Sequence, residues 1–447
     1  MNAQITRKLA ERVNTLRLDD MRAEDRAVAR QCLLDWFGVT LAGADEPGVT
    51  MLTADAEDQG GHAQATLVGQ GRRVAARQAA LINGTASHAH DYDDVNLAMN
   101  GHATVAVAGG VMALAERLDV SGEDLLAAFV AGYEATCHVG QLVLPSHYEN
   151  GFHATATTGV FGAAAACGRL LKLDDEQMAQ AFGIAGTMAA GLKANFGTDC
   201  KPFHAGRATE AGLLAANLAA RGFSSNPGIL EHGQGFAAAL SDDFRPDAMF
   251  AEAPRGGLHI RNNLFKYHAA CYNTHAAIEC GARLRSEQKI DPTSMVRGTI
   301  RIHRSCDKIC NQPSPETGLG IKFSLRMTTA LALAGIETAG LESYSDEAAN
   351  DPALTAIRDR LSVELVDDVT LTWTALQIEA EDGQRVATEH DSGIPADDVS
   401  EQGDRIAYKF QALAEPVIGG NRAGALRDAV MNLENQPSVA ELMQLAA

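Results

Sequence analysis

Residues 103–140 read ATVAVAGGVMALAERLDVSGEDLLAAFVAGYEATCHVG, and small apolar residues dominate them. Two stretches, 103–118 and 122–140, carry Ala, Gly, Val and Leu without the alternation expected of a half-buried strand. Between them, Ser121 followed by Asp124 is typical of a helix start, because the serine hydroxyl accepts an N–H bond from the first turn. This part of the chain therefore predicts two buried helices that pack closely through their small residues.

Helical patterns rich in Ala and Gly continue over residues 76–223. Further helices are predicted at 154–171, 175–194 and 206–221. Within the first of these, small residues recur at helical spacing, and we interpret them as packing residues rather than ligand contacts: Gly159, Gly162 and Ala166. The short segment 63–75 is predicted to be extended.

The pattern changes near residue 290. Residues 295–303 (MVRGTIRIH) alternate apolar and polar side chains, as a half-buried strand does. Two more strands are predicted at 361–378 and 384–390, with a helix at 322–333 between them and the first strand. After about residue 400 the helical pattern returns.

These patterns predict a mainly α fold with three segments along the chain. Residues 1–268 form the first part of a large all-helical domain, residues 269–400 form a smaller α+β domain, and residues 401–447 supply helices that rejoin the helical domain.

Composition restricts the partners and the compartment. The formal net charge of −20 argues against nucleic acid and anionic membrane as partners. Residues 1–18 predict an amphipathic helix without the features of a signal peptide, and no run of about 18 apolar residues is present. The eight cysteines are scattered without a C-x-x-C pair, as in reduced cytosolic proteins. We expect a cytoplasmic protein.

The most polar stretch, residues 83–104, gathers three histidines and three aspartates: His88, His90, His102, Asp91, Asp93 and Asp94. Buried charges need partners, so the stretch is either a solvated loop or the floor of a site. His88-Ala89-His90 suggests a metal pair, but positions i and i+2 of a helix point about 200° apart, and we predict no metal. Asp93 and Asp94 fit a helix end with solvent-facing acids. The functional interpretation is that Asp91 orients a histidine, with His102 in the same pocket, for proton transfer.

Three further clusters carry ionisable side chains. His153 lies at the first turn of a predicted helix, where it either caps the helix or helps to bind an anion. Lys201 and His204 lie in a predicted loop before an apolar helix, which favours a role in a site. Lys266, flanked by aromatic residues and followed by His275, lies at a predicted domain boundary, where small-molecule sites tend to form. Together the clusters describe a cationic pocket that transfers protons next to carboxylates.

These motifs, taken in order, resemble the MmgE/PrpD family over nearly the whole chain. The resemblance rests on the following segments: Leu34-Asp35 through Leu41-Ala42-Gly43, Asn83 to His88, Asp91 to Asp94, Gly151-Phe152-His153, Lys201 to Gly206, Phe265-Lys266-Tyr267 with His275, and Phe323-Ser324. It implies a helical domain built from both chain ends, a smaller α+β lid domain, a homodimer, and neither metal nor organic cofactor.

The resemblance also implies roles for individual residues. The catalytic group is expected to be His102, backed by Asp91, together with Lys201. His153 and Lys266, which match the family's active-site pattern, are expected to bind the carboxylates of the substrate. We expect the same of His275, His204 and Arg326 from their place in or beside the charged clusters.

Two departures from the family pattern guide the choice of reaction. Decarboxylase-like members have Thr where Val95 stands, and Tyr where Met327 stands after Arg326. Losing both hydroxyls disfavours reactions with a leaving group. The resemblance therefore favours proton abstraction next to a carboxylate of a small polycarboxylate, namely epimerisation of iminodisuccinate by two bases. The alternatives are a hydro-lyase on 2-methylcitrate-like substrates, a decarboxylase on cis-aconitate-like substrates, and a non-catalytic polycarboxylate binder.

Overall fold

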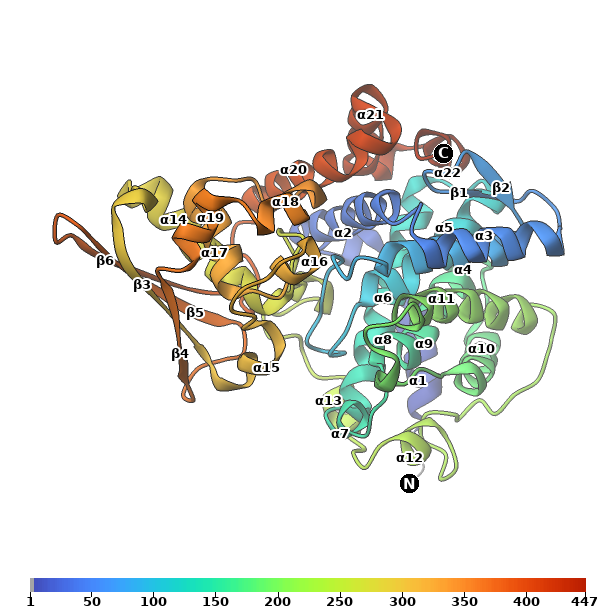
Figure 1. Cartoon of the computed structure of the whole chain (residues 1–447). Coiled ribbons are helices and arrows are strands. Elements are labelled where there is room, and N and C mark those ends of the chain that lie inside the picture. Colours follow the sequence, from blue (N-terminus) through green and yellow to red (C-terminus); the bar gives the residue numbers. More distant parts are fainter. Residues whose placement is uncertain (1–3) are drawn as a thin grey trace. The chain divides into compact units, whose positions relative to one another are not determined.

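The computed structural model describes residues 4–447, which fold into two compact units. The first unit comprises Met1–Phe265 and Asp397–Ala447, and the second comprises Lys266–Ala396 (Figure 1). The helix predicted for residues 1–18 spans Ile5–Thr15 (α1), and residues 1–3 lie outside the described part of the chain.

The first unit is helical apart from one small antiparallel pair of strands, β1 (Ala65–Leu67) and β2 (Arg72–Val74). Its N-terminal helices are α1, α2 (Ala23–Ala42), α3 (Pro47–Gln59), α4 (Ala76–His88), α5 (Ala103–Leu118), α6 (Gly122–Val143), α7 (Ser146–Glu149), α8 (Ala154–Thr157), α9 (Gly159–Leu170), α10 (Asp175–Met188), α11 (Cys200–Ala219), α12 (Phe236–Leu240) and α13 (Pro246–Met249). The C-terminal segment adds α20 (Val399–Ile418), α21 (Gly420–Met431) and α22 (Val439–Leu445). Short 3-10 turns include η2 (Lys193–Asn195) and η3 (His259–Asn262).

Glycines allow the central helices to approach closely. At Gly132 on α6, an added Cβ would lie 2.5 Å from the carbonyl oxygen of Gly162 on α9. At Gly159, it would lie 2.5 Å from the Cβ of Ala106 on α5. The prediction that Gly159 and Gly162 are packing residues is confirmed, because any larger side chain there would collide with a neighbouring helix.

A second group of glycines brings α4, α5 and α11 together. A Cβ at Gly84 would lie 2.9 Å from the Cα of Gly206, and a Cβ at Gly109 would lie 3.2 Å from the backbone nitrogen of Gly84. Each of these glycines lies one to two turns from a helix end that carries an ionisable residue of the polar clusters. The close crossing therefore fixes where His88, His102 and Lys201 can lie.

The second unit contains a four-stranded sheet in the order β4-β3-β5-β6. The strands are β3 (Met295–His303), β4 (Leu361–Val366), β5 (Trp373–Ala380) and β6 (Arg385–Asp391). β3 pairs in parallel with β4 and antiparallel with β5, and β5 pairs antiparallel with β6. Helices α14 (Tyr272–Gln288) and α17 (Leu325–Ala334) pack on the sheet and on each other. The remaining helices are α15 (Asp307–Cys310), α16 (Gly318–Ile321), α18 (Asp346–Ala349) and α19 (Pro352–Arg358).

A mainly α fold with a small α+β portion agrees with the sequence prediction, but several element bounds differ. The helix predicted at 175–194 ends at Met188. The helix predicted at 206–221 begins earlier, at Cys200, and Pro202 is tolerated in its first turn. The helix predicted at 154–171 is broken at Thr158 into α8 and α9. The strand predicted at 361–378 is two strands, since residues 367–372 leave the sheet between its parallel and antiparallel pairings.

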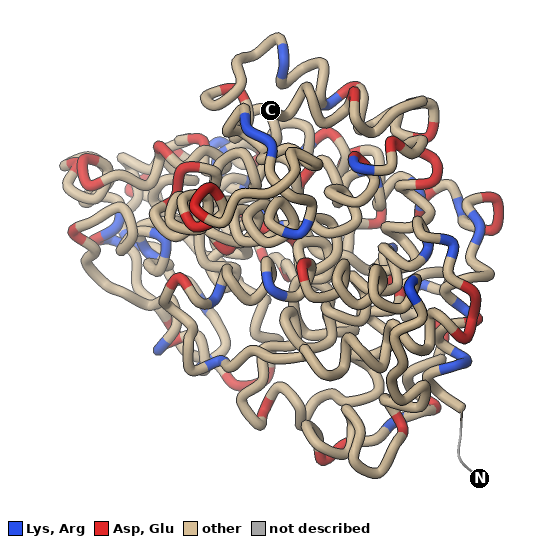
Figure 2. The backbone as a smooth tube through the Cα atoms, turned by 90° about the vertical axis from the view of Figure 1, so that its right-hand side faces the viewer, with Lys and Arg blue, Asp and Glu red and all other residues tan. Residues whose placement is uncertain are grey.

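Charged residues are spread along the described chain. On the side shown in Figure 2, Lys and Arg positions lie among Asp and Glu positions and form no continuous basic stripe. None of the helices within residues 4–447 combines the length and the apolar character that crossing a membrane requires.

We predict that Gly206→Ala lowers the free energy of unfolding by about 1–3 kcal/mol, because the new methyl group would meet the Leu81 carbonyl oxygen at 2.3 Å. The matched control is Gly424→Ala on α21, where a Cβ would meet nothing within 4 Å. That change should raise stability by up to about 1 kcal/mol, because alanine is the better helix former. Urea unfolding followed by circular dichroism measures both, and equal effects of the two changes would contradict the packing argument.

Candidate active site

Ionisable side chains from separate helix ends meet in the first unit. His88 is the last residue of α4, His102 immediately precedes α5, and His153 immediately precedes α8. Lys201 and His204 lie in the first turns of α11. The imidazole rings of His88 and His102 lie 4.5 Å apart between centroids, and His88 and His153 lie 6.0 Å apart. We call this group, with Asp91 and Asp93, the histidine cluster.

Asp93 lies between two of these histidines. Its Oδ1 accepts a hydrogen bond from His88 Nδ1 at 2.7 Å, and its Oδ2 lies 2.8 Å from His102 Nδ1. Burial opposes ionisation of Asp93, but His102 and His88 outweigh it and hold the pKa of this carboxyl well below its usual range. Asp93 is therefore a fully buried carboxylate paired with imidazole groups.

His88 is the neutral partner in this arrangement. Burial lowers its pKa to about 4, although the charge of Asp93 acts in the opposite direction. At neutral pH the ring therefore donates its Nδ1–H to Asp93 without carrying a charge. His90, two residues on, has different partners, the carbonyl oxygen of Ala42 at 3.1 Å and Glu46 at 3.5 Å. The two histidines have different partners, and His90 lies in the turn that follows α4 rather than in the helix.

His102 has one ring nitrogen held by the protein and one directed toward ionisable groups. Its Nδ1 donates to the carbonyl oxygen of Asp94 at 2.9 Å, and Asp93 Oδ2 lies near the same nitrogen in a less linear geometry. In the neutral ring this places the lone pair on Nε2. That nitrogen lies 3.7 Å from Asp91 Oδ1, and its side chain is 12% exposed. Nε2 can accept a proton from a small molecule, and Asp93 supplies the negative charge behind the ring.

Asp91 forms an ion pair with Lys201 and does not lie behind the His102 ring. Its Oδ1 lies 2.7 Å from Lys201 Nζ, and its backbone has a positive φ of 51°. This left-handed conformation turns the chain directly after α4, so that Asp91 and Asp93 point to different partners. We expected Asp91 to orient His102. In the structure the closer carboxylate is Asp93, and Asp91 joins His102 Nε2 to Lys201.

The far side of the histidine cluster is neutral. His153 Nδ1 and His204 Nδ1 lie 3.1 Å apart, so one ring donates to the other. Burial and the neighbouring positive groups lower the pKa of both rings. The Phe196 ring contacts the His153 ring. The Lys201 Nζ lies over the Phe196 ring, 5.4 Å from the centroid of that ring. Because α8 has a single turn, its helix dipole is weak, and His153 is better suited to donate one hydrogen bond than to attract an anion by charge.

Buried charges beneath the cluster hold the turn at residues 92–94 in place. Lys409 on α20 pairs with Asp35 at 2.6 Å and donates to the Tyr92 carbonyl oxygen at 2.7 Å. Asp94 accepts from Thr104 and Asn263, and burial raises the pKa of Asp94 to about 7. The backbone that carries Asp91 and Asp93 is thus anchored from both chain ends.

The other three expected site residues, Lys266, His275 and Arg326, belong to the second unit. Lys266 is its first residue and is buried. His275 on α14 donates its Nε2–H to the Ala270 carbonyl oxygen at 3.2 Å, and burial holds its pKa well below the usual range. Arg326 on α17 donates to the Leu361 carbonyl oxygen and to Asn311 Oδ1. These two bonds hold the guanidinium of Arg326 against its own unit.

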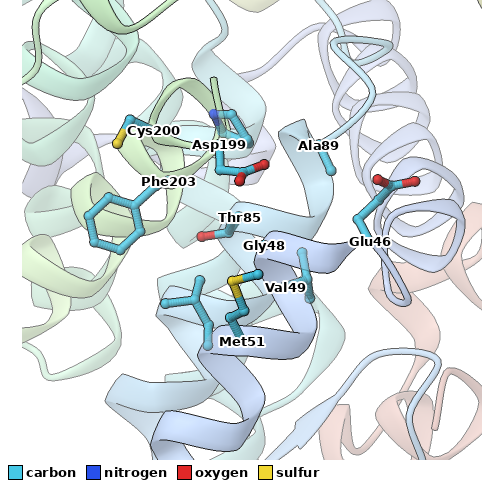
Figure 3. Close-up of a pocket in the computed structure, with 11 residues that line it drawn as sticks. Glu46, Gly48, Val49, Met51, Thr85, Ala89, Asp199, Cys200 and Phe203 are labelled. Atoms are coloured by element: carbon cyan, nitrogen blue, oxygen red, sulfur yellow. The ribbon is translucent and has the colours of Figure 1, made fainter. Parts of the chain in front are cut away.

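A pocket of about 260 Å³ lies beside the start of α11, but its chemistry does not suit an anion. Apolar side chains of α3 and α11 form most of its wall, together with the carboxylates of Glu46 and Asp199 (Figure 3). Cys200 is exposed at its edge. None of the residues that we expected to bind substrate lines this pocket, and the two carboxylates would repel a polycarboxylate.

The histidine cluster is also compact enough to raise the question of a metal ion. Ligand atoms of His88, Asp91, Asp93 and His102 lie within 4.8 Å of one another. However, Asp93 is engaged by both imidazoles and Asp91 by Lys201, whose positive charge would repel a cation. These pairings favour proton transfer, and a metal-free site remains a prediction.

The sequence interpretation placed His88 and Asp93 in supporting or capping roles. The structure shows that they carry the buried pair on which His102 depends. The one sequence signal for this pairing is that both residues fall next to a helix made of small apolar residues, where a solvent-facing carboxylate is unusual.

We predict that His88 stays neutral from about pH 8 to about pH 5, whereas a histidine in an unfolded peptide titrates near 6.5. The folded pKa is lowered, so the stability that the neutral ring contributes is complete above about pH 6.5 and is lost as the pH falls toward 4. Side-chain ¹⁵N shifts of histidine-labelled protein measure the titration, and His88→Asn assigns the resonance. A midpoint near 6.5 for that resonance would show that the ring is not buried as described.

Comparison with known proteins covers both units. Residues 7–249 match the MmgE/PrpD N-terminal domain, and residues 268–435 match the MmgE/PrpD C-terminal domain. Cis-aconitate decarboxylase of Homo sapiens is 26% identical over 459 aligned residues, covering 97% of this chain and 93% of that protein. Cis-aconitate decarboxylase of Aspergillus terreus is 23% identical over 474 residues, covering 99% and 95%. Both family domains are present in their usual order, and the chain belongs to the MmgE/PrpD family.

Proposed function

We propose that the chain is an enzyme that moves a proton at a carbon atom next to a carboxylate of a small polycarboxylate. The observation that carries this proposal is His102, whose Nδ1 is held by the Asp94 carbonyl while Nε2 lies 3.7 Å from Asp91, the carboxylate that pairs with Lys201. An imidazole with one fixed nitrogen and one free lone pair is suited to general acid–base catalysis. The ammonium group of Lys201 can bind a substrate carboxylate and stabilise the negative charge that develops next to it.

Decarboxylation of an unsaturated tricarboxylate is the first candidate reaction, because the relatives above carry the name cis-aconitate decarboxylase. In this reaction a carbon–carbon bond breaks and carbon dioxide leaves. The electron pair of that bond moves into the conjugated system, and an acid delivers a proton to carbon. Protonated His102 or Lys201 would supply that proton.

Epimerisation of iminodisuccinate is the second candidate, and the residues at two positions favour it. The family resemblance implies that Val95 and Met327 stand where decarboxylase-like members carry hydroxyl-bearing side chains. A reaction that only removes and returns a proton needs no group to assist a departing fragment. Here one of His102 and Lys201 would remove the proton and the other would return one to the opposite face.

In either reaction, His153 and His204 are proposed to bind the substrate as neutral hydrogen-bond donors. Lys266, His275 and Arg326 remain proposed carboxylate-binding groups. The homodimer and the lack of an organic cofactor also remain predictions.

An experiment in D₂O separates the candidate reactions. We expect cis-aconitate to release carbon dioxide and to give a product with one deuterium on carbon, if the chain is a decarboxylase. Iminodisuccinate should gain deuterium at carbon without loss of mass if it is an epimerase, and a 2-methylcitrate-like substrate should gain ultraviolet absorbance if it is a hydro-lyase. NMR and mass spectrometry follow each reaction. Binding of all three without any exchange would reject the proposed proton transfer.

We predict that His102→Gln and Asp93→Asn each lower kcat by about 10²–10⁴-fold, whichever substrate is turned over. The first change removes the base, and the second removes the charge that supports it. His62→Gln, on an exposed loop, is the matched control and should leave kcat unchanged. Circular dichroism and KM separate a loss of chemistry from a loss of folding. Near-normal kcat in His102→Gln would assign the base elsewhere.

A further inference from the structure

A second group of metal-binding residue types lies in the first unit, apart from the histidine cluster. Glu134 and His138 lie four residues apart on α6, so that their side chains share one face of the helix. His259 begins η3. Ligand atoms of the three residues lie within 4.8 Å of one another. All three residues are buried, with exposures of 5%, 1% and 4%.

In the described part of the chain, one ring nitrogen of His138, Nε2, is left without a hydrogen bond beside Glu134 and His259. Its Nδ1 donates to the carbonyl oxygen of Met249 at 2.6 Å. This bond fixes the tautomer with the lone pair on Nε2, as in many metal-bound histidines. Nε2 has no hydrogen-bond partner within residues 4–447, and the same holds for both ring nitrogens of His259. Polar atoms this deeply buried without partners are rare in folded proteins.

Glu134 is held in position by the segment that carries His259. Its two carboxylate oxygens accept the backbone N–H groups of His259 and Ile260, each at 2.9 Å. A bound cation would favour the charged carboxylate and the neutral imidazoles at once.

We propose that Glu134, His138 and His259 bind one divalent transition-metal ion of the zinc class. Two imidazole nitrogens and one carboxylate are a known protein ligand set for Zn²⁺, and imidazole selects such ions over Mg²⁺ and Ca²⁺. The histidine cluster differs, because Asp91 there is paired with the positively charged Lys201, whereas Glu134 accepts uncharged backbone N–H groups. Arg12 is a charged neighbour of all three groups, but its side chain is exposed, so solvent screens its charge.

The ion would have a structural role and would add a metal to a chain for which the family resemblance implies none. It would join α6 to η3. The next residue after η3, Asn263, donates to Asp94 at 2.8 Å, and the His259 carbonyl oxygen accepts from Asn96 at 3.0 Å. The metal would therefore fix the segment that supports the turn of the histidine cluster. The proposal does not depend on which reaction the enzyme catalyses.

The test uses the full-length protein and two metal ions. We expect elemental analysis of the purified protein to find about one zinc per chain. After dialysis against a chelator, titration with Co²⁺ should give visible d–d absorption with a stoichiometry of about one, since Co²⁺ reports on Zn²⁺ sites of this ligand set.

Variants locate the ion. His259→Ala and Glu134→Gln should each weaken Co²⁺ binding at least tenfold, and the exposed His62→Ala control should bind like the wild type. Glu134→Gln preserves the shape of the side chain, so it stays informative if His259→Ala does not fold, which circular dichroism checks. Two outcomes would overturn the proposal: a wild-type protein that binds neither ion, as expected if Glu134 shares a proton with a histidine, or Co²⁺ absorption that survives both changes and disappears in Asp93→Asn.

Discussion

The buried carboxylate of Asp93, held between His88 and His102, is the constraint on which the site depends. A carboxylate without solvent is stable only when paired, and removing one partner of a buried pair costs about 3–5 kcal/mol. The pairing therefore fixes the end of α4 relative to the start of α5, because each helix contributes one imidazole. It also decides the chemistry of His102, whose remaining nitrogen is the one free to exchange a proton.

A second layer of buried charge supports the first. Lys409 reaches from α20 to Asp35 on α2 and to the carbonyl oxygen of Tyr92, and it lies 3.8 Å from the Tyr92 ring centroid. The C-terminal segment is thus part of the support of a turn more than three hundred residues earlier. This ion pair joins the two chain segments that make up the first unit. A helical domain that ended before residue 397 would leave Asp35 buried without this cation.

The small residues of the central helices also help to position the residues of the histidine cluster. Close contact at Gly84 and Gly206 allows α4 and α11 to cross with little space between their backbones. As a result, two residues from distant parts of the sequence, His88 and Lys201, come to the same region, where Asp91 and Asp93 join them. The stability of the helix packing and the geometry of the site are therefore set by the same positions.

The sequence by itself predicted most of the elements, and it named several of the residues that the structure brings together in the histidine cluster. Residues 103–118 and 295–303 have the predicted bounds, because periodicity and a cap or an alternation mark them locally. His102, Lys201, His153 and Asp91 were identified as site residues from residue type and from resemblance. Only the tertiary structure decided which aspartate pairs with the histidines and which pairs with Lys201. The positive φ of Asp91 turns the chain, so Asp93 enters the protein interior and Asp91 faces Lys201. Neighbouring aspartates look alike in a sequence, and their roles differ because burial and the direction of the backbone differ.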